Sequence, residues 1–170
     1  MGIPMKKKLC VITILAFLLL TISGCGSVEN STPGTFVSKS VLSGTVSPLV
    51  LGVQITLILP DGVTVEIDPV TGKPLVTALA PNDVATSGGL LDAEYVHADG
   101  TTPGQVKIAI IRGDTSKPFT AGDFFSVVCV VAAGQAVPSS SAFSFSGLKI
   151  WDADGNDITS SSGATATVSL

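Results

Sequence analysis

The sequence predicts an all-β protein, a jelly-roll sandwich of about nine strands, and three observations support that fold class. Only 13% of the 170 residues are charged, whereas Gly, Ser, Thr, Val and Ala are abundant, and Val, Ile and Thr suit a half-buried pleated surface. Clusters of Gly, Pro, Asp and Asn recur every ~8–12 residues, as in sandwiches and barrels. Between these clusters, apolar and polar residues alternate with the period of a strand.

The individual strands follow from this alternation. In Val53–Leu59 every second residue is apolar, while Gln54 and Thr56 face the other way. Pro60-Asp61-Gly62 is a turn by composition, because Pro sets φ and Gly tolerates positive φ. We expect strands at residues 36–42, 53–59, 63–67, 73–79, 90–97, 105–112, 123–132, 143–151 and 164–170.

Two of these segments carry further information. In Gln105–Arg112, Val106, Ile108 and Ile110 share one face, which predicts that they point into the core. Asp123–Ala132 is apolar almost throughout, which is typical of a strand covered on both faces. Residues 80–85 break the strand pattern and are predicted to form one short helical turn.

The N-terminal segment has the features of a cleavable, helical signal peptide. Lys6, Lys7 and Lys8 precede an apolar run from Leu9 to Ile22, which is shorter than the ~20 residues that span a bilayer. Ile22-Ser23-Gly24-Cys25 resembles the lipobox of bacterial lipoproteins. That resemblance implies cleavage between Gly24 and Cys25 and a diacylglyceryl group on the Cys25 thiol. The alternatives are an ordinary secretory signal with an incidental Cys, and an uncleaved anchor.

These features divide the chain into a signal peptide (1–24), a lipidated tether (25–35) and a β-sandwich domain (36–170). The tether is small, polar and interrupted by Pro33 and Gly34, as flexible linkers are. Two or three acyl chains hold a protein stably on a bilayer, so the partner at this end is the membrane itself. Because Gly26 stands where some lipoproteins have the Asp that retains them at the inner membrane, we expect this chain at the outer membrane. Both the periplasmic and the surface face of that membrane stay open.

The cysteine count excludes a disulfide within the mature protein. Cys10 leaves with the signal and Cys25 carries lipid, so Cys129 remains alone. Cys129 lies in an apolar run and is expected to be a small buried hydrophobic residue. A reactive thiolate would need a nearby His or a helix N-terminus, and the local sequence offers neither.

Charge argues against nucleic acid as a partner, because the net charge is −4 and the basic residues of the domain are scattered. The densest polar cluster, residues 152–157, is interpreted as a turn built on Asp-Gly, with a calcium site as the alternative. It does not fit an EF-hand loop, which needs Gly at its sixth position and Glu at its twelfth. The candidate calcium ligands are Asp152, Asp154, Asn156 and Asp157; no other cofactor is expected.

Nothing in the chain indicates an enzyme. His97 is the only histidine, it is expected at the end of a strand, and no Gly-x-Ser-x-Gly motif accompanies it. Asp92 and Glu94 are two positions apart and share a strand face, and we attribute this carboxylate pair to chance. Trp151 and Tyr95 are the only Trp and Tyr, so we expect half-buried sandwich residues instead of an aromatic strip for sugars.

Three stretches in order resemble cohesin domains. They are Gly52–Asp61, with its Gly-Val-Gln-Ile-Thr-Leu pattern leading to a Pro-Asp turn; Val106–Val127, with a Phe…Gly-Asp-Phe step before a long strand; and Phe143–Ile158, where a strand runs into an Asp…Gly turn. The resemblance implies a nine-strand jelly roll that grips a helical dockerin through one sheet face. The related cellulose-binding modules share that sandwich and compete for the match.

The sequence therefore predicts a membrane-anchored lipoprotein that acts as a non-catalytic binding or scaffolding module for another protein. One alternative is a carbohydrate-binding module with a glycan partner. The other is a structural component of the cell envelope.

Overall fold

The strands form where the alternation predicts them. The computed structural model describes residues 33–43, 50–78, 89–113, 119 and 122–170, and nine strands lie within these ranges, as expected. They are β1 (Gly34–Ser43), β2 (Gly52–Ile58), β3 (Val63–Val65), β4 (Val76–Ala78), β5 (Leu90–Val96), β6 (Gln105–Ile111), β7 (Gly122–Val131), β8 (Ser144–Trp151) and β9 (Thr165–Ser169). Two short helices, η1 (Ser140–Ala142) and α2 (Thr159–Ser162), flank β8.

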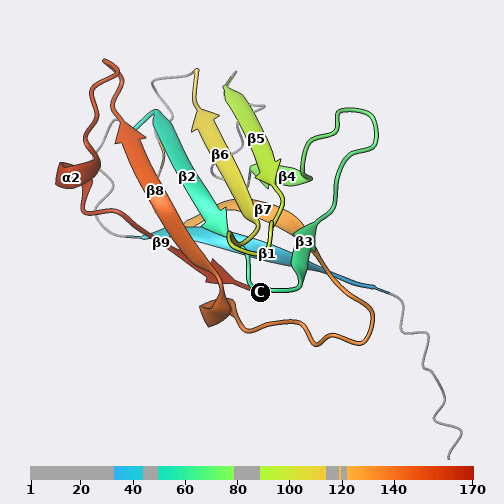
Figure 1. Ribbon diagram of the computed structural model, residues 1–170. Helices are drawn as coiled ribbons and strands as arrows, with labels where there is room; N and C mark the ends of the chain where they lie inside the picture. The colour runs from blue at the N-terminus through green and yellow to red at the C-terminus, as the bar shows by residue number, and fades with distance from the viewer. Residues whose placement is uncertain (1–32, 44–49, 79–88, 114–118, 120–121) are drawn as a thin grey trace, which may run out of the picture. The chain divides into compact units, whose positions relative to one another are not determined.

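The strands build two antiparallel sheets that pack as a sandwich (Figure 1). Sheet A has the order β3-β7-β1-β9, and β4 also pairs with β7. Sheet B has the order β5-β6-β2-β8. The chain crosses repeatedly from one sheet to the other, so both sheets depend on contacts between residues far apart in the sequence.

The core lies between the sheets and is built from every second residue. On β2, Val53, Ile55 and Leu57 are buried while Gln54 is exposed, as predicted. The inward residues predicted for β6 are buried as well. Sheet A contributes the inner face of β7, together with the buried hydroxyl groups of Ser38 and Ser40 on β1.

The most apolar strand, β7, is the centre of sheet A, with β1 on one side and β3 and β4 on the other. Its register against β1 shifts between Ser40 and Val41, so that β7 carries one extra residue there. The bulge explains why the adjacent residues Phe124 and Phe125 are both buried. On the outer face Val128 and Val130 are half-buried, so the predicted cover on both faces is only partial there.

A second bulge lies in β8. The register against β2 shifts between Gln54 and Thr56, and Gly147 adopts a φ of 62°, which favours Gly. The extra residue lets Phe145 and Leu148, three positions apart, both pack against the core. The sequence pattern did not predict this bulge.

Some predicted boundaries are longer than the observed strands. β3 ends at Val65, and Ile67 forms only an isolated bridge with Pro74. The following chain turns because the Asp68 carboxylate accepts hydrogen bonds from the backbone N–H groups of Val70 and Thr71. The helical turn predicted at residues 80–85 lies outside the described residues. In the described part of the chain, no helix is long and apolar enough to cross a membrane.

Candidate functional site

One end of the outer face of sheet B carries a row of apolar residues that runs across all four strands. Leu90 lies opposite Ile111, Ile111 opposite Gly52, and Gly52 opposite Trp151. Leu90 is 60% exposed and Ile111 is 51% exposed. We call these four residues the apolar row. Large apolar side chains side by side on a surface mark a contact site more often than single ones do.

Gly52 allows the row to be continuous. It is buried beneath Trp151, and a Cβ atom added to it would lie 3.3 Å from the Trp151 Cε3 atom. The absence of a side chain therefore lets the indole ring lie against the β2 backbone. Trp151 is half-buried, as predicted.

A surface hollow of about 320 Å³ lies at this end of the sheet. Gly52, Ile111 and Trp151 line it, together with Leu51, Arg112, Asp152, Ala153 and Gly155. The Arg112 side chain is buried and its guanidinium carbon lies 4.8 Å from the centre of the Phe119 ring. The hollow thus has a largely apolar lining and an acidic rim.

The acidic rim is the turn at residues 152–157. The Asp152 carboxylate accepts hydrogen bonds from the backbone N–H groups of Asp154 and Asn156, each at 2.9 Å, and from the Asn156 side-chain amide. The Asp157 carboxylate accepts bonds from the N–H and hydroxyl of Thr159. These bonds lower the pKa of Asp152, through Asn156 above all, and the pKa of Asp157, through Thr159. The predicted turn is confirmed.

Calcium at this turn stays a prediction. The oxygens of Asp152 and Asp157 already accept several hydrogen bonds each, and a cation would have to replace some of them. Among the described residues, no group of three or more His, Cys, Asp or Glu side chains is arranged to hold a metal ion.

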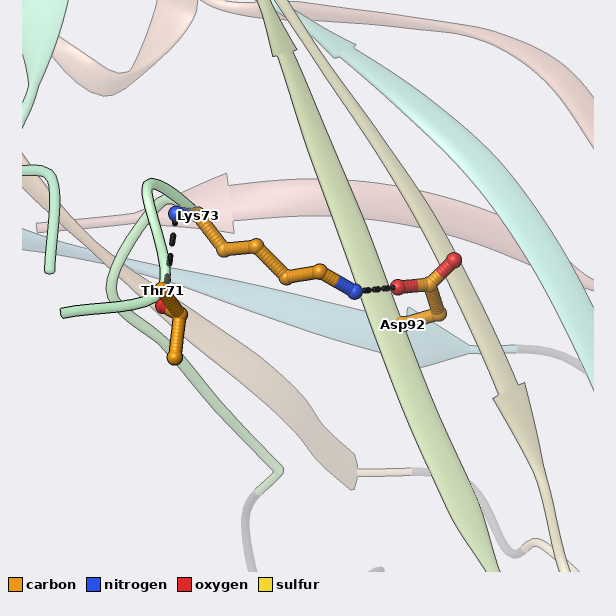
Figure 2. A network of polar contacts seen from close by, with 3 residues as sticks. All are labelled: Thr71, Lys73 and Asp92. Atoms are coloured by element: carbon orange, nitrogen blue, oxygen red, sulfur yellow. Dashed lines mark hydrogen bonds and ion pairs between the residues drawn. The ribbon is translucent and has the colours of Figure 1, made fainter.

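Much of the remaining outer face of sheet B is polar. Asp92 and Glu94 share the exposed face of β5, as predicted, and bind Lys73 and Lys107 respectively. Figure 2 shows Lys73 extending from the chain between β3 and β4 to the Asp92 carboxylate. The hydrogen bond from Lys73 lowers the pKa of Asp92. Both pairs are exposed, and exposed ion pairs contribute little to stability. They therefore affect the charge of this surface more than the stability of the fold.

His97 and Cys129 lie where the sequence predicts them. His97 follows the end of β5, is exposed, and its ring lies 4.4 Å from that of Tyr95. Cys129 is fully buried, and burial raises the pKa of its thiol, so the neutral form persists at neutral pH. Gly24 and Cys25 lie outside the described residues.

The apolar row was not predicted, although two apolar doublets in the sequence indicate part of it. The doublets Leu90-Leu91 and Ile110-Ile111 break the alternation, so one member of each must face outward. Only the register shows that the outward members meet each other and Trp151 across four strands.

The architecture places the chain among proteins built on a sandwich of two antiparallel sheets. Comparison with protein-family models, with curated proteins and with solved structures finds no match.

Acid is expected to weaken the fold through its turn aspartates. Asp99 accepts hydrogen bonds from the Thr101 hydroxyl and from the N–H groups of Thr101 and Thr102, which lower its pKa from 3.8 to about 2. Because the folded-state pKa lies below the unfolded one, this stabilisation is complete above about pH 4 to 5 and disappears as the pH falls toward 2. The melting temperature should follow the same course.

Asp99→Asn is the matched variant, since its amide oxygen still accepts hydrogen bonds but does not titrate. Thermal melts from pH 6 to pH 2 should show a shallower acid decline for the variant. An equally steep decline in both chains would remove Asp99 as a source of the pH dependence.

Proposed function

We propose that this chain is a membrane-anchored lipoprotein whose β-sandwich acts as a non-catalytic binding module for another protein. The single observation that carries the binding role is the apolar row, in which Leu90 and Ile111 are exposed side by side and Trp151 follows beyond Gly52. Burying such side chains against a partner contributes roughly 25 cal/mol per Å² of apolar surface, before the costs of association.

The surroundings of the row suggest the chemistry of the partner. The acidic turn borders the hollow on one side through Asp152, and Asp154 in the same turn is exposed. A protein segment that offers an apolar anchor and an adjacent Lys or Arg fits both features. A charged rim around an apolar centre is also the usual build of a protein interface.

The membrane anchor rests on the signal features and on the lipobox-like Ile22-Ser23-Gly24-Cys25. Lipidation at Cys25 would set the sandwich on a short tether next to the bilayer. Mass spectrometry of the chain from its native membrane should find the lipid on an N-terminal Cys25. An unmodified N-terminus elsewhere would contradict the anchor.

Site-specific photo-crosslinking tests the binding face. A photoreactive phenylalanine analogue at Ile111, within the row, should capture one protein in intact cells. The same analogue at Thr64, which is exposed on β3 of sheet A, is the matched control and should not capture it. Ile111→Lys should abolish the adduct formed by the analogue at Leu90.

Other results would overturn the proposal. Equal adducts from both sheets would show that the row is not the contact face. A glycan-array signal that disappears in Trp151→Ala, without any protein adduct, would replace the protein partner by a sugar stacked on the indole ring.

A further inference from the structure

The β9 edge of the sandwich is poor in charged side chains, although Lys39 of β1, opposite Ser169, is exposed beside it. No Lys, Arg, His, Asp or Glu occurs in residues 124–148 or 158–170. These two stretches contain η1, most of β7 and β8, and all of β9. Depletion of charged residues is the compositional mark of the centre of a protein interface.

The strand β9 is the edge of sheet A on this side. Among the described residues, β1 is the only strand that pairs with it. Thr165, Thr167 and Ser169 are exposed, while Ala166 and Val168 pack partly against the core. An edge strand presents unpaired N–H and C=O groups that can accept a further strand.

A groove runs beside this edge. It has a volume of about 240 Å³ and is lined by Phe143 and Phe145 on one side and by Ala166, Thr167 and Val168 on the other, with Ser140, Ser141 and Ser144 at its margin. A strand added to β9 would direct alternate side chains into this groove, because successive side chains of a strand point to opposite faces.

The two edge strands of sheet B, β5 and β8, have features that oppose the addition of a further strand, and β9 lacks these features. β5 exposes Asp92 and Glu94, and two copies paired through β5 about Ala93 would set these carboxylates against each other. β8 has its bulge at Gly147, and Ile150 bonds back to Ile158 and Thr159. β9 has no charge, no proline and no bulge against β1.

We propose that β9 is the pairing edge for a second copy of this chain, in an antiparallel two-fold arrangement centred on Thr167. In this register Thr167 lies opposite the partner's Thr167, and Thr165 lies opposite the partner's Ser169. Ala166 lies opposite the partner's Val168, so the small apolar residues of both copies face the grooves. The sequence of β9 is therefore complementary to itself, and sheet A continues from one copy into the next.

The alternation of β9 favours a second copy as the occupant, because each residue of the strand meets a residue of the same polarity in the reversed strand. The net charge of −4 on each chain opposes self-association, but pairing through β9 sets no like charges of that strand opposite each other. The paired strands have only five residues, which is small against a standard interface of ~1,600 Å². We therefore expect weak self-association, with a dissociation constant on the order of 0.1 mM.

Single cysteines test the register in the full-length chain, held in detergent micelles with Cys10 and Cys25 replaced by Ser. Thr167→Cys should form a disulfide-linked dimer on mild oxidation, because its Cα atom lies within bonding reach of its own counterpart. Thr165→Cys and Ser169→Cys should remain monomeric alone and cross-link when mixed. Asp92→Cys on β5 is the control for random collision.

A second variant measures the equilibrium itself. Thr167→Lys sets like charges opposite each other at an exposed position and should weaken self-association at least ~10-fold in sedimentation runs, without changing the melting temperature. Thr64→Lys on the exposed face of β3 should leave self-association unchanged. A chain that stays monomeric at ~1 mM, or that cross-links through Thr165→Cys alone or through Asp92→Cys as efficiently as through Thr167→Cys, would overturn the proposal.

Discussion

Replacing Phe125 by Ala should lower the free energy of unfolding by about 3–5 kcal/mol, the range measured for buried aromatic residues. Phe125 is fully buried on β7. Its ring makes edge-to-face contacts with Phe124 at 5.3 Å and with Phe145 at 6.5 Å between centroids. The change removes contacts to both sheets at once, because Phe145 belongs to sheet B and β7 to sheet A.

Urea unfolding followed by Trp151 fluorescence would measure this loss. Val37→Ala is the matched control, since Val37 lies on the outer face of sheet A and is 45% exposed; its cost should be below about 1 kcal/mol. Similar losses for the two variants would mean that the space between the sheets is not the main source of stability.

Much of the fold was predictable because side chains alternate between the buried and the exposed face of a strand, so that apolar residues recur at every second position. In β2 the alternation of Val53, Ile55 and Leu57 with polar residues indicated both the strand and its inward face. Such patterns report burial directly, and they required no knowledge of the neighbouring strands. The pairing partners of each strand could not be predicted in this way, because pairing depends on residues far away in the chain.

The candidate site shows that difference clearly. The turn at residues 152–157 was predictable because Asp and Gly act locally, through hydrogen bonds such as those from Asp154 and Asn156 to Asp152. The apolar row was not, because Leu90, Ile111 and Trp151 meet only through the register of three strand pairs. Local chemistry is visible in a sequence, whereas a surface assembled across a sheet is not.

Deleting Gly147 and deleting Lys149, which lie two residues apart in β8, should have very different effects on the free energy of unfolding. Gly147 and Leu148 together lie opposite Ile55, so deleting Gly147 removes the extra residue of the bulge. Phe145 and Leu148 then stand two positions apart and still face the core as a regular strand requires. We expect this chain to fold with a stability within about 1 kcal/mol of the parent.

Deleting Lys149 should instead cost about 3–5 kcal/mol or prevent folding. Leu148 and Ile150 would become neighbours, so one of them must turn to solvent, and Ile150 is fully buried in the parent. The cost combines the exposure of an aliphatic side chain with the cavity that it leaves. Urea unfolding and amide NMR spectra of both variants would measure the contrast. Equal damage from the two deletions would show that the fold requires the glycine bulge as well as the inward alternation of β8.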